Sequence, residues 1–273
     1  MKKITSLLIV VLSIFQMQVV AEKSENGFYT RFQNMQIKVS FYSPEIVRIV
    51  RFPINSQLNK QSLSVVKTPE NVEFTYSDNH LQTIIETSKL KVTYNKSIGQ
   101  FVFADESGKI LFEEKANGAQ FTPVTDVNRQ SNIFRQAFLL EQDEAIYGLG
   151  QHQNGKLNQR FGRINLKQDN MKIAIPFIHS IKGYGLFWDN YAATQYTDNV
   201  QEFSFESLGD CEDYYFMYGS NADGVIAHMR NLTGQSPMIP LWAFGYNQSK
   251  ERYKSQDELV GIVKKYRELQ VPI

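Results

Sequence analysis

The chain has 273 residues, of which 42% are hydrophobic and 21% charged, and its net charge is +1. Because both signs of charge are interspersed, the sequence offers no basic stripe for nucleic acid and no basic amphipathic helix for a membrane surface. The composition therefore favours a neutral ligand. The single cysteine, Cys211, excludes an intrachain disulfide and a thiolate metal cluster.

The N-terminal segment has the pattern of a secretory signal peptide. Two lysines follow Met1, an apolar stretch covers residues 4–15, and small residues end at Ala21. This stretch is shorter than the ~20 residues that a membrane-spanning helix needs, and no cysteine stands at the cleavage site to carry a lipid. We expect residues 1–21 to be cleaved near Ala21 and the mature protein to be periplasmic or secreted.

The segment from about Asn26 to Tyr218 is rich in predicted strands. Apolar runs at 101–103 and 110–112 flank the turn residues 105–108, which is the pattern of a β-hairpin. Further strands are expected over 35–42, 46–52, 83–85, 90–94, 173–179, 184–188, 200–208 and 214–218. Strands at this density, with turn signals between them, predict a β-sandwich. We assign it to residues 22–236.

A helix and a stiff linker close this predicted domain. Asn221 is the expected start and Gly234 the expected end of the helix. Its apolar face is predicted to consist of Val225, Ile226, Met229 and Leu232. The proline-containing segment 236–240 then acts as the linker, and we place the domain boundary there.

Residues 237–273 have the pattern of one β/α unit. The apolar run 241–246 predicts a strand buried on both faces, as in a parallel sheet. Ser255 and Glu258 have the spacing of a capping box, and apolar residues recur at helical spacing up to Leu269. The last residues, 271–273, have the pattern of an approach to another strand. The chain is therefore expected to stop within a repeating β/α fold.

Several cofactor and catalytic motifs are absent from the sequence. Gly148, Gly150 and Gly155 lack the spacing of a dinucleotide-binding loop, and no helix follows them. There is no Gly-x-Ser-x-Gly or His-Glu-x-x-His motif, and the four histidines are scattered without ligand spacing. We predict no cofactor and no metal. Acidic residues are many, but none are marked as a catalytic pair.

Four motifs in combination resemble glycoside hydrolase family 31. They are 147–151 (YGLGQ), 175–177 (IPF), 182–190 (KGYGLFWDN) and 240–246 (PLWAFGY), with the last match continuing to Ile273. The resemblance implies a mainly β fold: a galactose-mutarotase-like β-sandwich, then the first β/α unit of a (β/α)8 barrel that the chain leaves incomplete. Residues 248–253 (QSKERY) resemble most the bacterial α-xylosidases, and α-glucosidase is the nearby alternative.

The family resemblance implies a retaining, exo-acting hydrolase that cleaves α-linked xylosyl or glucosyl residues of oligo- or polysaccharides. In such enzymes one aspartate attacks the sugar and a second protonates the leaving oxygen. The resemblance places both on later barrel strands, so no catalytic residue is assigned here. The chain alone is expected to be inactive without the missing barrel portion of the same polypeptide.

Polar residues in two loops are candidate contacts to the carbohydrate substrate: Gln168, Asp169, Asn170, Gln248, Lys250, Glu251 and Arg252. The resemblance places the first three on a sandwich loop that covers the barrel mouth. The last four follow a predicted barrel strand, whose C-terminal end faces the active site in such folds. The alternatives are an ordinary polar turn before residue 173 and a solvated loop before the helix.

A second hypothesis belongs to another class of function. The chain could be complete as translated and act as a non-catalytic carbohydrate-binding or scaffolding sandwich. Against this, the apolar face of the last helix would lack a barrel to bury it. That face consists of Leu259, Ile262, Val263 and Tyr266.

Overall fold

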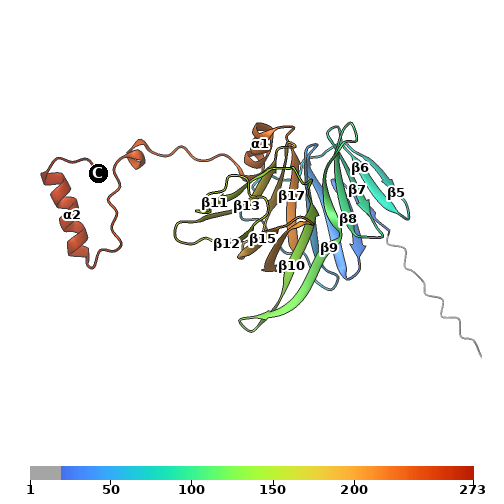
Figure 1. Ribbon diagram of the computed structural model, residues 1–273, viewed down its shortest axis with the longest axis horizontal. Helices are drawn as coiled ribbons and strands as arrows, with labels where there is room; N and C mark the ends of the chain where they lie inside the picture. Colours follow the sequence, from blue (N-terminus) through green and yellow to red (C-terminus); the bar gives the residue numbers. More distant parts are fainter. Residues whose placement is uncertain (1–19) are drawn as a thin grey trace, which may run out of the picture. The chain divides into compact units, whose positions relative to one another are not determined.

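The structure, a computed structural model, describes residues 20–273 (Figure 1). Most of the predicted signal peptide, residues 1–19, lies outside the described residues. The described chain divides into two compact units, one ending at Gly234 and the other spanning Gln235–Ile273. No helix within residues 20–273 is long and apolar enough to cross a membrane.

The first unit is a sandwich of two antiparallel sheets (Figure 1). The eight-stranded sheet has the order β1 (Glu22–Ser24), β2 (Gly27–Phe32), β3 (Met35–Ser43), β4 (Ile46–Pro53), β17 (Glu212–Tyr218), β14 (Tyr184–Trp188), β13 (Ile173–Ser180) and β11 (Ile146–Gln151). The nine-stranded sheet has the order β12 (Arg163–Leu166), β15 (Thr194–Asp198), β16 (Phe203–Gly209), β10 (Arg129–Leu139), β9 (Ile110–Asp126), β8 (Gln100–Asp105), β7 (Leu90–Asn95), β6 (Gln82–Glu86) and β5 (Thr75–Asp78). The predicted β-sandwich is therefore confirmed.

One predicted strand begins later than expected. The strand predicted from residue 200 starts only at Phe203, as β16. The reason is a turn around Asn199, whose side-chain oxygen accepts hydrogen bonds from the backbone N–H of Gln201 at 2.8 Å and of Glu202 at 3.2 Å. An asparagine that bonds to the backbone two residues on favours a turn over a strand.

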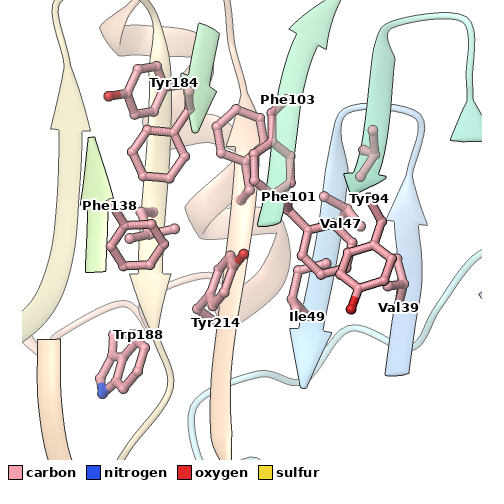
Figure 2. Close-up of a cluster of buried hydrophobic side chains, with 14 of the residues drawn as sticks. Val39, Val47, Ile49, Tyr94, Phe101, Phe103, Phe138, Tyr184, Trp188 and Tyr214 are labelled. Atoms are coloured by element: carbon pink, nitrogen blue, oxygen red, sulfur yellow. The ribbon is translucent and has the colours of Figure 1, made fainter. Parts of the chain in front are cut away.

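Aromatic side chains from both sheets fill the core (Figure 2). Phe103 of β8 stacks on Phe216 of β17 with ring centroids 4.3 Å apart. The ring centroids of Phe112 on β9 and Tyr184 on β14 lie 4.9 Å apart. Both pairs join one sheet to the other, so they contribute directly to the packing of the sandwich.

Helix α1 (Ala222–Thr233) packs on the outer face of the eight-stranded sheet (Figure 1). The Asn221 side chain caps its start by accepting from the Gly224 N–H at 2.9 Å. Val225 and Leu232 are buried and Met229 packs beside them, as predicted. Ile226 does not share this face and is 44% exposed. The buried face consists of Val225, Met229 and Leu232, which have the helical spacing i, i+4 and i+7. Position 226 is rotated by about 100° around the helix axis from position 225 and so points away from this face.

The second unit contains the 3-10 helix η1 (Leu241–Phe244) and helix α2 (Gln256–Glu268). The prediction of a strand over 241–246 is wrong. A strand requires a neighbour with which to exchange backbone hydrogen bonds, and within Gln235–Ile273 there is none. Residues 241–244 instead form the 3-10 helix η1, in which the Ala243 N–H donates to the Pro240 carbonyl at 3.0 Å.

Helix α2 begins at the predicted capping residue. Ser255 Oγ accepts from the Glu258 N–H at 3.2 Å. The Glu258 carboxylate accepts from the Lys254 N–H at 2.8 Å, one residue before the donor used in the standard capping box. The helix start is thus capped from both sides.

Candidate functional site

The first group of candidate contacts lies in the connection from β12 of one sheet to β13 of the other. The Gln168 amide donates to the Lys172 carbonyl at 2.8 Å and accepts from the Ala174 N–H at 3.2 Å. Asp169 Oδ1 accepts from the Asn170 N–H at 2.8 Å. Gln168 therefore ties the loop to the start of β13, while Asp169 and Asn170 lie exposed at its tip.

A surface cavity of about 320 Å³ adjoins this loop. Gln168 lines it, together with Pro176 of β13 and the turn 190–193 after β14, whereas Asp169 and Asn170 do not. All three residues are exposed, and Gln168 alone of the three lines this cavity.

The second group of candidate contacts lies between η1 and α2 in the second unit. Gln248 Oε1 accepts from the hydroxyls of Tyr246 at 2.7 Å and Tyr266 at 2.6 Å. Lys250 forms an ion pair with Glu258. Both side chains are held by neighbours in the second unit.

Glu251 and Arg252 differ from these two. Among residues 20–273, neither side chain forms a hydrogen bond or an ion pair, and both are exposed. Their charged groups are therefore available to a ligand. A solvated loop would also leave these two side chains exposed and unbonded, so the contacts of Glu251 and Arg252 to the substrate remain a prediction.

The glycines of the 147–151 motif have a structural role in β11. Gly148 and Gly150 have φ of +121° and +94°, and the pairing of β11 with β13 shifts register between them. A Cβ atom at Gly150 would lie 2.0 Å from the Ile173 carbonyl oxygen. Only glycine permits this close approach, which holds the first residues of β13 directly after the 168–170 loop.

The end of the 182–190 motif is anchored by buried charges. Asp189 is 1% exposed and lies 3.4 Å from Lys60 Nζ, which also contacts Asp213 at 2.7 Å. Burial lowers the pKa of Lys60, but Asp213 and Asp189 outweigh it and raise that pKa above its ordinary value. Lys60 therefore stays charged and holds the turn that lines the cavity. Sequence reasoning missed Lys60, because no motif marks it.

Asp189 and Asp213 do not have the properties of a catalytic carboxylate pair. Both side chains are buried in ion pairs, since Arg48 also contacts Asp213 at 2.6 Å. Burial, and next the Asp213 carboxylate, raise the pKa of Asp189. In the part of the chain that the structure describes, no group of three or more His, Cys, Asp or Glu side chains could hold a metal ion.

Comparison with known families matches both units. Residues 36–196 match the Glycosyl hydrolase 31 N-terminal galactose mutarotase-like domain, and residues 236–273 match the Glycosyl hydrolases family 31 TIM-barrel domain. The Alpha-xylosidase of Saccharolobus solfataricus is 36% identical over 89% of this chain and 34% of its own. Alpha-glucosidase 2 of Bacillus thermoamyloliquefaciens is 26% identical over 87% of this chain and 31% of its own. The chain thus spans about a third of the length of these relatives.

Solved structures share the fold. A GH31 α-xylosidase from a soil metagenome, complexed with xylose, superposes with a TM-score of 0.78 at 22% identity. The match covers 93% of this chain and 40% of that one.

Proposed function

The chain belongs to glycoside hydrolase family 31, and we propose that it forms the N-terminal part of a secreted, retaining α-glycoside hydrolase. Its substrates would be α-linked xylosyl or glucosyl residues at the ends of oligo- or polysaccharides. The observation that carries this proposal is the 36% identity to an α-xylosidase over 89% of the chain. Because the α-glucosidase relative is only 26% identical, xylosyl is the favoured residue.

In the proposed mechanism two carboxylates act on the same glycosidic bond. One attacks the anomeric carbon as the other protonates the leaving oxygen, and water then releases the sugar with its configuration retained, which requires carboxyl groups ~5 Å apart. We assign both to barrel strands outside residues 1–273. We therefore expect that the 273-residue chain by itself does not hydrolyse glycosides.

Asp169 and Asn170 are the sandwich residues that we propose to contact the sugar. Asp169 is exposed, and among residues 20–273 only one of its carboxylate oxygens accepts a hydrogen bond, from the neighbouring backbone. The Gln168 hydrogen bonds that fix the loop would reduce the entropy lost when Asp169 binds a sugar hydroxyl. In the second unit we propose Glu251 and Arg252 as contacts. Gln248 and Lys250 would then position that loop.

The test is an assay of the longer protein that contains this chain against aryl α-xyloside and α-glucoside. We expect hydrolysis of the xyloside and, by NMR, the α-anomer of xylose as the first product. Asp169→Ala should lower kcat/KM by ~10–100-fold, the cost of one charge-assisted hydrogen bond. Asp126→Ala, at the exposed end of β9, is the matched control. Release of the β-anomer, or no release of either sugar, would contradict the proposal.

The proposed export has a separate test. Fractionation of the producing cells and N-terminal sequencing should find the protein outside the cytoplasm with a new N-terminus near Ala21. An intact Met1 on the fractionated protein would contradict it.

The alternative is a non-catalytic carbohydrate-binding or scaffolding sandwich. The match of residues 236–273 to a TIM-barrel domain favours the enzyme, because a scaffold has no need of a barrel segment. Wild-type longer protein that binds but never cleaves the aryl glycosides would support the alternative.

A further inference from the structure

A second and larger cavity, of about 620 Å³, lies in the first unit. It is lined by the loop 56–61 after β4, the turn 190–192 after β14, Asn132 of β10 and residues 208–211. None of the candidate contacts to the substrate lines it. We propose that this cavity binds a short neutral oligosaccharide, at a site additional to the proposed catalytic one.

The size and the walls of the cavity suit a small ligand. Its volume falls within the ~300–1,000 Å³ typical of ligand sites. The lining mixes apolar groups such as Leu58 and Leu208 with amide side chains. Ligand sites commonly combine such an apolar surface with a few placed polar groups.

Tyr191 supplies a rigid aromatic surface in the cavity wall. Its hydroxyl donates to the Gln61 carbonyl at 3.1 Å and accepts from the Leu63 N–H. Lys60 Nζ lies 5.2 Å from the ring centroid, yet the residue is still 49% exposed. A tyrosine held in this way offers a flat apolar face to a sugar ring, and little side-chain entropy remains to be lost on binding.

Amide side chains supply the polar contacts. Among residues 20–273, the side chains of Gln57, Asn59 and Asn132 form no hydrogen bond. Each amide can donate two hydrogen bonds and accept two, which matches neighbouring sugar hydroxyls that both donate and accept. Asn190 is partly used, since its oxygen accepts from the Ala192 N–H at 2.9 Å. The cavity therefore presents hydrogen-bonding capacity that the protein itself does not use.

The charges around the cavity favour a neutral ligand over an anion. Lys60 pairs with Asp213 at 2.7 Å and with Asp189 at 3.4 Å. Arg48 also pairs with Asp213, so these two cations are balanced by the two carboxylates. Asp210 adds a further carboxylate to the lining, and burial raises the pKa of the Cys211 thiol to about 12, so the thiol stays uncharged. A phosphate or carboxylate would meet negative charge here, whereas a sugar would not.

The test is a ligand-observed NMR titration of the 273-residue chain with isomaltotriose and cellotriose, and with inorganic phosphate as the anionic probe. We expect at least one trisaccharide to bind with a dissociation constant of about 1 mM or lower, and phosphate not to bind. Asn59→Ala, Asn132→Ala and Tyr191→Ala should each weaken binding at least fivefold. Because the asparagine side chains bond to no described residue, their replacement should leave the fold intact, which circular dichroism would verify.

Two control variants separate this cavity from other surfaces. Tyr29→Ala removes a tyrosine of similar exposure, 42%, from β2, and Asp126→Ala removes an exposed carboxylate at the end of β9. Both should bind as the parent does. The proposal is overturned if no trisaccharide binds, if the three cavity variants bind normally, or if either control variant abolishes binding. Since hydrolysis is measured on the longer protein, failure of the titration would leave the proposed enzyme activity unaffected.

Discussion

Arg51 and Glu114 form a buried ion pair that joins the two sheets of the sandwich. Arg51 Nη2 on β4 lies 2.6 Å from Glu114 Oε2 on β9, and the side chains are 1% and 0% exposed. The same guanidinium pairs with Glu212 of β17 and donates to Gln136 of β10 at 3.2 Å. One cation therefore holds two carboxylates in the middle of an aromatic core.

Replacing Arg51 is expected to be severely destabilising. Arg51→Met leaves both carboxylates buried without a cation, and such a loss typically costs ~3–5 kcal/mol of the free energy of unfolding. Urea denaturation followed by circular dichroism would measure it. Arg31→Met, on an exposed position of β2, is the matched control and should change stability by no more than ~0.5 kcal/mol. Equal stability of the two variants would show that the ion pair contributes nothing.

Glu212 is expected to make stability depend on pH. Burial, only partly opposed by Arg51, raises the pKa of Glu212 to about 7, and its Oε2 atom has no hydrogen-bond partner among residues 20–273. Because the folded pKa lies above the unfolded value of 4.5, the stabilisation is fully present below pH 4.5 and is lost as pH rises through about 7. The loss amounts to roughly 3 kcal/mol.

Urea titrations of the parent and of Glu212→Gln between pH 4.5 and 8 would check this effect. Glutamine cannot ionise, so the stability of the parent relative to the variant should fall as pH rises. Glu206→Gln, at an exposed position of β16, is the control and should keep the pH slope of the parent. A constant difference between parent and Glu212→Gln across this range would refute the assignment.

The strands predicted from sequence are those with a strong local signal. Apolar runs such as 184–188 formed strands because they are buried on both sides. Seven strands are missing from the prediction: β1, β2, β5, β10, β11, β12 and β15. The short strands β12 and β15 are missed because their apolar residues alternate with many polar side chains. They are stabilised by pairing with each other, and Gln195 adds a hydrogen bond to the Ile164 carbonyl at 2.9 Å. Pairing between residues far apart in sequence leaves no local pattern.

Prediction of the candidate site is limited in the same way, because contacts between residues far apart in sequence leave no local pattern. The loop at Gln168–Asn170 is predicted through the family resemblance, and the structure adds that Gln168 fixes the loop. The larger cavity is not predicted, because its walls come from segments far apart in sequence, such as the loop 56–61 and residues 208–211. For residues 241–246, composition predicted a buried strand, but a strand forms only where a partner strand is present.

Gly150 tests why the 147–151 motif needs glycine. Gly150→Ala places a methyl group against the Ile173 carbonyl in a backbone conformation with φ of +94°. The conformation costs ~1–2 kcal/mol for alanine, and the overlap adds ~1–3 kcal/mol. Gly108→Ala is the matched control, because its φ is +86° but nothing lies within 4 Å of the new methyl group. Thermal melts should show a clearly larger loss for Gly150→Ala; similar losses would mean that contact with β13 is unimportant.

Ser207 is expected to stabilise the core through Trp188. The buried indole N–H of Trp188 donates to Ser207 Oγ at 2.8 Å, and Ser207 also lies 2.7 Å from Thr194 Oγ1. Ser207→Ala leaves the indole N–H without this acceptor, at a cost of ~1–3 kcal/mol. The chain has two tryptophans, so a Trp242→Phe background makes fluorescence report on Trp188 alone.

In that background, urea unfolding should give a lower midpoint for Ser207→Ala than for its parent. Ser204→Ala on the same strand is the matched control, because Ser204 is also buried but its hydroxyl does not bond to Trp188. If the two serine variants lower the urea midpoint equally, the loss of stability comes from replacing a buried serine on this strand and not from the hydrogen bond to Trp188. A larger shift for Ser207→Ala, with a changed emission maximum of the native protein, assigns it to the tryptophan hydrogen bond.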